Sequence, residues 1–126
     1  METEEIQAAY IEFQNDHPGF VELLVLSESG EQLFASDLDF ATPEETAQLM
    51  NAWLTNQPVV EIKEMRFPIL KWDELQFAAR NVSGYGALIG AKTKSGNYAV
   101  VHLDTSTKTP LLQATVELNR WSFSLL

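Results

Sequence analysis

The chain has 126 residues, no cysteine and a formal net charge of −10, from 18 Asp and Glu against eight Lys and Arg residues. Residues 1–62 contain no Lys or Arg at all. Such an acidic surface repels phosphate and excludes nucleic acid and anionic membranes as partners, and the lack of cysteine excludes disulfides and zinc–thiolate sites.

The length predicts a single domain over residues 1–126. The chain contains no apolar stretch of about 18 residues, the length that a helix needs to span a bilayer. The acidic N-terminus is unlike a signal peptide. We therefore predict a cytoplasmic protein. The sequence Asn81-Val82-Ser83 matches a glycosylation sequon, which we interpret as accidental because no export signal accompanies it.

The first 36 residues predict a helix followed by a hairpin. Over residues 3–15, apolar side chains recur at the spacing of one buried helix stripe. The His-Pro-Gly sequence at 17–19 ends this helix. Residues 20–26 form a mainly apolar run of strand length, and residues 31–36 return as a second strand after a turn at 27–30.

A capping box marks the start of a central helix. Thr42 supplies the N-cap hydroxyl, Pro43 occupies the first helical position, and Glu45 follows the cap by three residues. The helix should end near Leu54. Its apolar residues spread over more than one stripe, whereas a helix that covers one sheet face needs only one, so the second flank suggests an interface.

Beyond this helix the pattern changes to strands. Residues 59–80 alternate in places between apolar and polar, but Pro68 must interrupt or edge a strand there, which leaves its register open. Residues 85–92 and 98–103 predict two further strands, and Thr-Pro at 109–110 opens a last helix. The predicted order, α-β-β-α-β-β-β-α, indicates an α+β fold whose five-stranded antiparallel sheet has helices on both faces.

No group of residues predicts catalysis, a metal site or a cofactor. His102 and Asp104 could orient a nucleophilic serine, but no Gly-x-Ser-x-Gly sequence accompanies them. The other histidine, His17, is expected in an exposed turn. Asp37 and Asp39 could supply two oxygen ligands, but the closing glutamate of a calcium loop is missing. We therefore predict a protein that is not an enzyme and binds no cofactor.

Three features resemble the roadblock / dynein light-chain family of the profilin-like superfold. They are the leading helix that ends in His17-Pro18-Gly19-Phe20, the hairpin Val21–Ser36 with its apolar strand and Ala-Ser return, and the order of elements. The resemblance covers nearly the whole chain, although residues 59–80 are longer than the single strand expected there. It implies a homodimer that serves as a platform for a small GTPase or another protein partner. The implied dimer interface consists of Ala47, Leu49, Met50, Trp53, Leu54, Val60 and Ile62.

Two alternatives stay open. The first is a profilin-like monomer that binds a partner protein or a proline-rich peptide through its terminal helices, with Tyr10, Trp121 and Phe123 as its possible partner surface. The second is a small-ligand sensing domain of similar topology. A sensor needs a pocket inside the sheet, and the apolar strands favour a filled interior instead.

Overall fold

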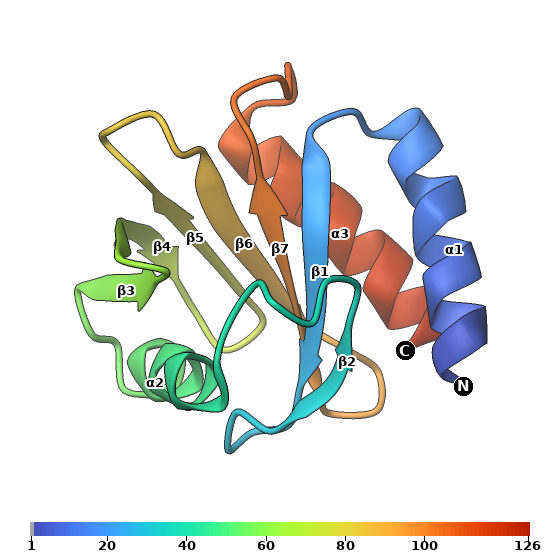
Figure 1. Ribbon diagram of the computed structural model, residues 1–126, viewed down its shortest axis with the longest axis horizontal. Helices are drawn as coiled ribbons and strands as arrows, with labels where there is room; N and C mark the ends of the chain where they lie inside the picture. The colour runs from blue at the N-terminus through green and yellow to red at the C-terminus, as the bar shows by residue number, and fades with distance from the viewer. Residues whose placement is uncertain (1) are drawn as a thin grey trace.

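Seven antiparallel strands form one sheet in the computed structural model, which describes residues 2–126 (Figure 1). The strands are β1 (Phe20–Leu26), β2 (Gln32–Ala35), β3 (Val59–Ile62), β4 (Met65–Trp72), β5 (Gln76–Arg80), β6 (Ala87–Lys92) and β7 (Tyr98–Leu103). They lie in the order β2-β1-β7-β6-β5-β4-β3. The helices are α1 (Thr3–Asp16), α2 (Pro43–Leu54) and α3 (Leu111–Leu125). The helices α1 and α3 cover one face of the sheet, and α2 lies on the other (Figure 1).

The predicted five-stranded sheet is wrong, because residues 59–80 fold into three strands and not into one. Lys63 and Glu64 both have positive φ, 51° and 65°, and join the paired residues Ile62 and Met65. Positive φ at both central residues is what a type I′ hairpin turn requires. Neither residue is the Asn, Asp or Gly that usually announces such a turn, so the sequence pattern hides it.

Pro68 lies within β4 and does not end it. It stands opposite Val59 of β3, and the strand is irregular between Ile69 and Lys71, where it pairs with β5. A short edge partner and a bulge are places where a strand tolerates proline. The Asp73 carboxylate then accepts two backbone hydrogen bonds, each of 2.8 Å, that shape the turn from β4 to β5.

The predicted capping box of the central helix is confirmed. The Glu45 amide donates to the Thr42 hydroxyl at 3.1 Å, and the Thr42 amide donates to the Glu45 carboxylate at 2.9 Å. The second carboxylate oxygen of Glu45 accepts a hydrogen bond of 2.6 Å from the Lys63 amide. The cap therefore also ties the start of α2 to the turn between β3 and β4.

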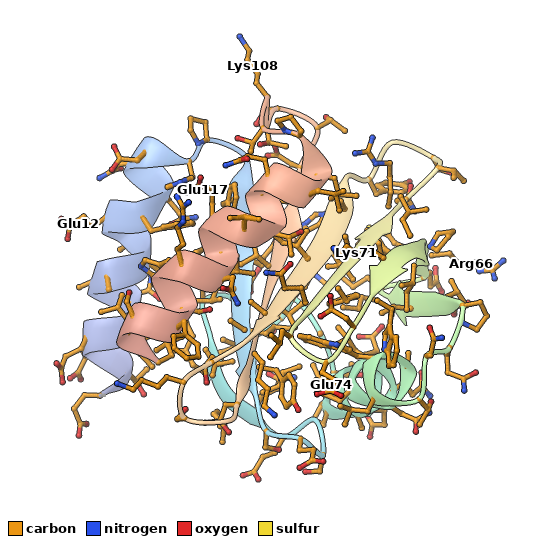
Figure 2. The ribbon with its side chains drawn as sticks, turned by 180° about the vertical axis from the view of Figure 1, so that it is seen from behind. Glu12, Arg66, Lys71, Glu74, Lys108 and Glu117 are labelled. Atoms are coloured by element: carbon orange, nitrogen blue, oxygen red, sulfur yellow. The ribbon has the colours of Figure 1, made fainter. Side chains whose placement is uncertain are left out.

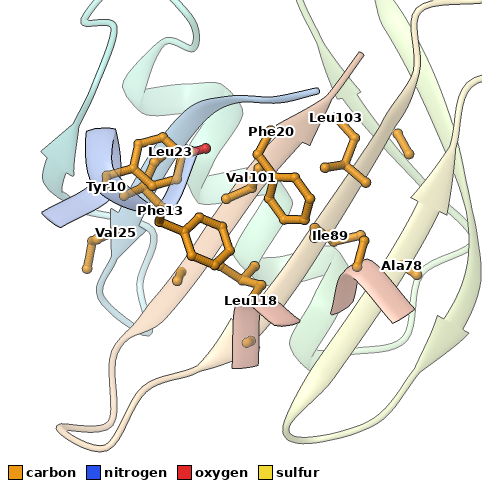
Figure 3. Close-up of a cluster of buried hydrophobic side chains, with 14 of the residues drawn as sticks. Tyr10, Phe13, Phe20, Leu23, Val25, Ala78, Ile89, Val101, Leu103 and Leu118 are labelled. Atoms are coloured by element: carbon orange, nitrogen blue, oxygen red, sulfur yellow. The ribbon is translucent and has the colours of Figure 1, made fainter. Parts of the chain in front are cut away.

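Two hydrophobic cores lie on the two faces of the sheet. Under α1 and α3, Tyr10 and Phe13 pack against Leu118 and the central strands (Figure 3). Under α2, the wholly buried Trp53 lies with its ring centre 4.8 Å from Phe77 and 4.9 Å from that of Tyr98. Its indole nitrogen donates to the Asp73 carbonyl at 2.8 Å. Both faces are thus filled by side chains of a single copy.

Gly90 provides the space that Trp53 occupies, because a Cβ there would lie 2.4 Å from the Phe77 ring and 2.7 Å from the Trp53 ring. We expect Gly90→Ala to lower the free energy of unfolding by about 1–3 kcal/mol, since an added methyl group strains a filled core. Urea unfolding measures this as a lower midpoint at unchanged slope. An unchanged midpoint would contradict the close packing described for this core.

Candidate functional site

The residues predicted to form a dimer interface lie mostly inside their own subunit. Five of them are buried beneath α2 and at the edge of the sheet: Leu49, Met50, Trp53, Val60 and Ile62. The two that remain exposed are Ala47 and Leu54. The second apolar flank of α2 is therefore covered by the sheet itself, which leaves a twin copy little apolar surface to bury.

The three residues considered as a partner surface do not share one surface. Tyr10 is wholly buried, with its ring centre 5.6 Å from that of the half-buried Trp121. Burial, with a smaller contribution from the charge of Glu22, raises the pKa of Tyr10 far above its ordinary value. Only Phe123 is well exposed, at 52%, and it lies beside Leu75 on the flank of α3 that faces away from α1.

The residues considered for chemistry do not form a reactive site. Asp37 accepts a hydrogen bond of 2.9 Å from the Asp39 amide in the exposed loop before α2. Among residues 2–126, no group of three or more possible ligands gathers that could hold a metal ion. The carboxylate that contacts His102 is Glu22 of β1 and not Asp104.

One flank of α3 combines exposed apolar side chains with nearby cations. The apolar side chains Leu112, Val116 and Phe123 recur at helical spacing and are 38–54% exposed. Within the sheet, α3 packs mainly on β6 and β5, and β4 is the next strand after β5, so no helix covers β4 on this face (Figure 2). We call this surface the α3–β4 face and define it by Leu70, Lys71, Leu75, Arg80, Leu112, Val116 and Phe123.

The two cations of this face have no carboxylate partner in the described part of the chain. Lys71 of β4 stands opposite Ala78, whose side chain belongs to the core under α3, so Lys71 points to that same side of the sheet (Figure 2). Within residues 2–126, neither Lys71 nor Arg80 takes part in an ion pair. An exposed apolar patch with a polar rim is typical of a protein-binding surface. This one suits a partner that offers apolar residues together with carboxylates.

The loop at one end of the α3–β4 face, residues 81–86, is held by the buried side chain of Asn81. Its amide nitrogen donates to the Arg66 carbonyl at 2.7 Å, and its oxygen accepts from the amides of Ser83 and Tyr85 at 2.7 and 3.1 Å. The loop thereby presents Val82, 87% exposed, and Tyr85, 56% exposed. The side-chain nitrogen of Asn81, which would carry a glycan at the sequon, is the atom that donates to the Arg66 carbonyl.

His102 holds the same loop from the other side. Its Nδ1 lies 2.8 Å from a carboxylate oxygen of Glu22, and its Nε2 lies 2.7 Å from the Tyr85 carbonyl oxygen. Both partners are acceptors, so the doubly protonated, cationic form of His102 is the form that donates to both at once. Burial lowers the pKa of His102, but the hydrogen bonds to Glu22 and Tyr85 and the charges of Glu22 and Asp104 outweigh it and raise that pKa.

Comparison with known proteins gives one curated relative at high similarity, while no family model matches the chain. Loki profilin-3 of Lokiarchaeum sp. (strain GC14_75) is 31% identical over 111 residues, which cover 87% of this chain and 89% of the relative.

Solved structures with a similar fold are also profilins. LokiProfilin2, in complex with rabbit actin, has a TM-score of 0.79 at 10% identity and covers 99% of this chain and 100% of its own. Acanthamoeba castellanii profilin IA has a TM-score of 0.75 at 16% identity, over 98% of this chain and 94% of its own.

These findings overturn the resemblance to the roadblock / dynein light-chain family. The predicted homodimer and the predicted small-GTPase platform are wrong as well, since the related structures pair a profilin with actin. The prediction of a protein that binds another protein agrees with the solved profilins, which include complexes with rabbit actin. Among the helices of residues 2–126, none has the length and apolar character needed to cross a membrane.

Asn81 should be the main support of the loop at 81–86. We expect Asn81→Ala to lower the free energy of unfolding by about 1–3 kcal/mol, because the Arg66 carbonyl and two loop amides lose a buried side-chain partner. Urea unfolding measures the loss. Ser83→Ala is the matched control, since the Ser83 hydroxyl makes no hydrogen bond to any of residues 2–126, and it should leave the midpoint unchanged. Equal effects of the two substitutions would contradict this role of Asn81.

Proposed function

The chain belongs to the profilin family, and on that premise we propose that it binds an actin as a single copy and is not a catalyst. The family relationship carries the proposal: a relative 31% identical over most of both chains is a profilin, and profilins of the same fold have been solved bound to rabbit actin. The fold supports a monomer because the apolar side chains of α2 are buried against the sheet of the same copy. Cytoplasmic residence stays a prediction and fits this role.

We place the actin contact on the α3–β4 face. Leu112 and Val116 would supply the desolvated centre of the interface, and Lys71 and Arg80 would lie at its rim. The chain as a whole is acidic, with 18 Asp and Glu against eight Lys and Arg. The cations of this face therefore favour a partner that places carboxylates opposite them, and long-range attraction would raise the rate of association.

A proline-rich peptide is a second candidate partner, favoured by a surface recess between the ends of the terminal helices. The recess has a volume of about 330 Å³ and is lined by Ile6, Leu33, Phe34 and Leu125 among others. Grooves that bind proline-rich segments are lined by aromatic rings, and Phe34, the aromatic residue of this recess, is only 4% exposed. The recess therefore supports this candidate less than the α3–β4 face supports a protein partner.

A small-ligand sensor, the other alternative, has less support still. Such a protein needs internal space beside the sheet. The close contacts around Gly90 leave no room for even one added methyl group at that position.

Replacing Leu112 by aspartate tests the placement of the contact. We expect Leu112→Asp to raise the dissociation constant for monomeric rabbit actin at least about tenfold, since a charge in the desolvated centre of an interface costs more than about 1.4 kcal/mol. Lys71→Glu should raise it less, through slower association. Fluorescence anisotropy of the labelled chain, titrated with rabbit actin, measures both effects.

Leu38→Asp is the matched control, because Leu38 is 81% exposed in the loop between β2 and α2 and lies outside the α3–β4 face. It should bind rabbit actin as tightly as the unaltered chain. Weakening by Leu38→Asp but not by Leu112→Asp would move the contact to another surface. No binding by the unaltered chain would overturn the proposed function itself.

A further inference from the structure

The loop at residues 81–86 adjoins the α3–β4 face where α3 begins. Gly84 and Gly86 of the loop line a surface hollow of about 350 Å³ together with Arg80 and Leu111. A Cβ at Gly86 would lie 1.8 Å from the Leu103 carbonyl oxygen, so the backbone of the loop passes directly against β7. The direction in which the loop points therefore affects the shape of this part of the face.

Two side chains fix the peptide groups around Tyr85. The Asn81 oxygen accepts from the Tyr85 amide, and His102 donates to the Tyr85 carbonyl from Nε2. Glu22 in turn accepts from Nδ1 of His102 at 2.8 Å. A line of hydrogen bonds thus runs from β1 through β7 to the exposed loop.

The charges around His102 decide what happens when it loses its proton. Glu22 contacts the ring directly, and Asp104 contributes a second negative charge from the end of β7. The ring also stacks on Phe40, at 5.5 Å between centres, and the Lys63 ammonium lies 6.0 Å from the centre of the same Phe40 ring. On the remaining side His102 contacts the edge of the aromatic ring of Phe67 and the Tyr85 backbone.

A neutral histidine has one N–H for these two acceptors, so it must release one of them. An ionised carboxylate is the stronger acceptor, since hydrogen bonds to charged groups are about twice as strong as neutral ones. Glu22 therefore keeps the remaining N–H of His102, and the carbonyl of Tyr85 loses its donor.

We propose that His102 is a positioning residue of the partner-binding face, where its Nε2–H holds the Tyr85 carbonyl and orients the loop at residues 81–86 for actin. This role rests on the proposed function and adds a pH dependence to it: actin binding weakens when His102 becomes neutral.

The direction follows from the raised pKa of His102. The loop is fully held below the ordinary histidine pKa of about 6.5, and it is released as pH rises through the raised value. The same charged contacts stabilise the fold below about pH 6.5 and lose that contribution over the same rise.

The test is the dissociation constant for rabbit actin between about pH 5.5 and 9, a range that begins below the ordinary histidine pKa, for the unaltered chain and three variants. For the unaltered chain we expect it to rise at least about threefold, as the loop loses one hydrogen bond. His102→Gln should abolish the dependence, since no group at that position then titrates. Glu22→Gln should move the rise to lower pH, because the carboxylate that raises the pKa of His102 is removed. His17→Gln is the matched control, because His17 lies between α1 and α3, with its Nε2 3.6 Å from a carboxylate oxygen of Glu117. This substitution should leave the pH profile of actin binding unaltered.

Amide hydrogen exchange of residues 82–86 gives a readout that does not involve actin. Relative to intrinsic rates, exchange in the unaltered chain should speed up as pH rises, while in His102→Gln it should be fast throughout. A rise of the actin dissociation constant that persists in His102→Gln, or no rise at all, would overturn the pH-dependent role. Exchange that does not differ between the two chains would overturn the positioning of the loop. If rabbit actin does not bind, the proposed function fails, and the exchange measurement still decides whether His102 holds the loop.

Discussion

The rest of the structure depends on the packing of the Trp53 side chain between α2 and the sheet. Its ring fills the space above Gly90 between Phe77 and Tyr98, its indole nitrogen donates to the Asp73 carbonyl, and its own carbonyl accepts from the indole of Trp72. One residue thus joins α2 to the middle of the sheet and to the turn between β4 and β5. Because this packing takes up the apolar side of α2, that helix has little apolar surface left for contact with a second copy.

The packing of Trp53 also bears on the α3–β4 face, the surface that we assign to a partner. The Trp53 indole holds the β4–β5 turn, and β4 lies outside the part of the sheet on which α3 mainly packs. Lys71 and Leu75 then lie uncovered beside the apolar flank of α3. Two polar side chains, the buried Asn81 and the half-buried His102, fix the loop at one end of this face. The proposed binding surface therefore exists because β4 lies beyond the strands that α3 covers.

Local signals in the sequence predict the helices and the hairpin of β1 and β2 well, because the capping box at Thr42 and the apolar spacing of residues 3–15 need only near neighbours. The prediction of one strand over residues 59–80 fails for a physical reason. Lys63 and Glu64 adopt positive φ, which neither residue type indicates in a sequence. The burial of Trp53 depends on strands distant in the chain, so helical spacing alone could not separate a core flank from an interface. The pair of Glu22 and His102 joins residues 80 positions apart, beyond the reach of any short motif.

A footprint of bound rabbit actin on this chain tests the central claim most directly. Amide hydrogen exchange, recorded with and without a saturating amount of rabbit actin, should show new protection in β4, β5 and the first turns of α3, with α2 unchanged. Protection concentrated on residues 43–54 would contradict the account, because it would mean that α2 keeps a binding surface which the packing of Trp53 has already used.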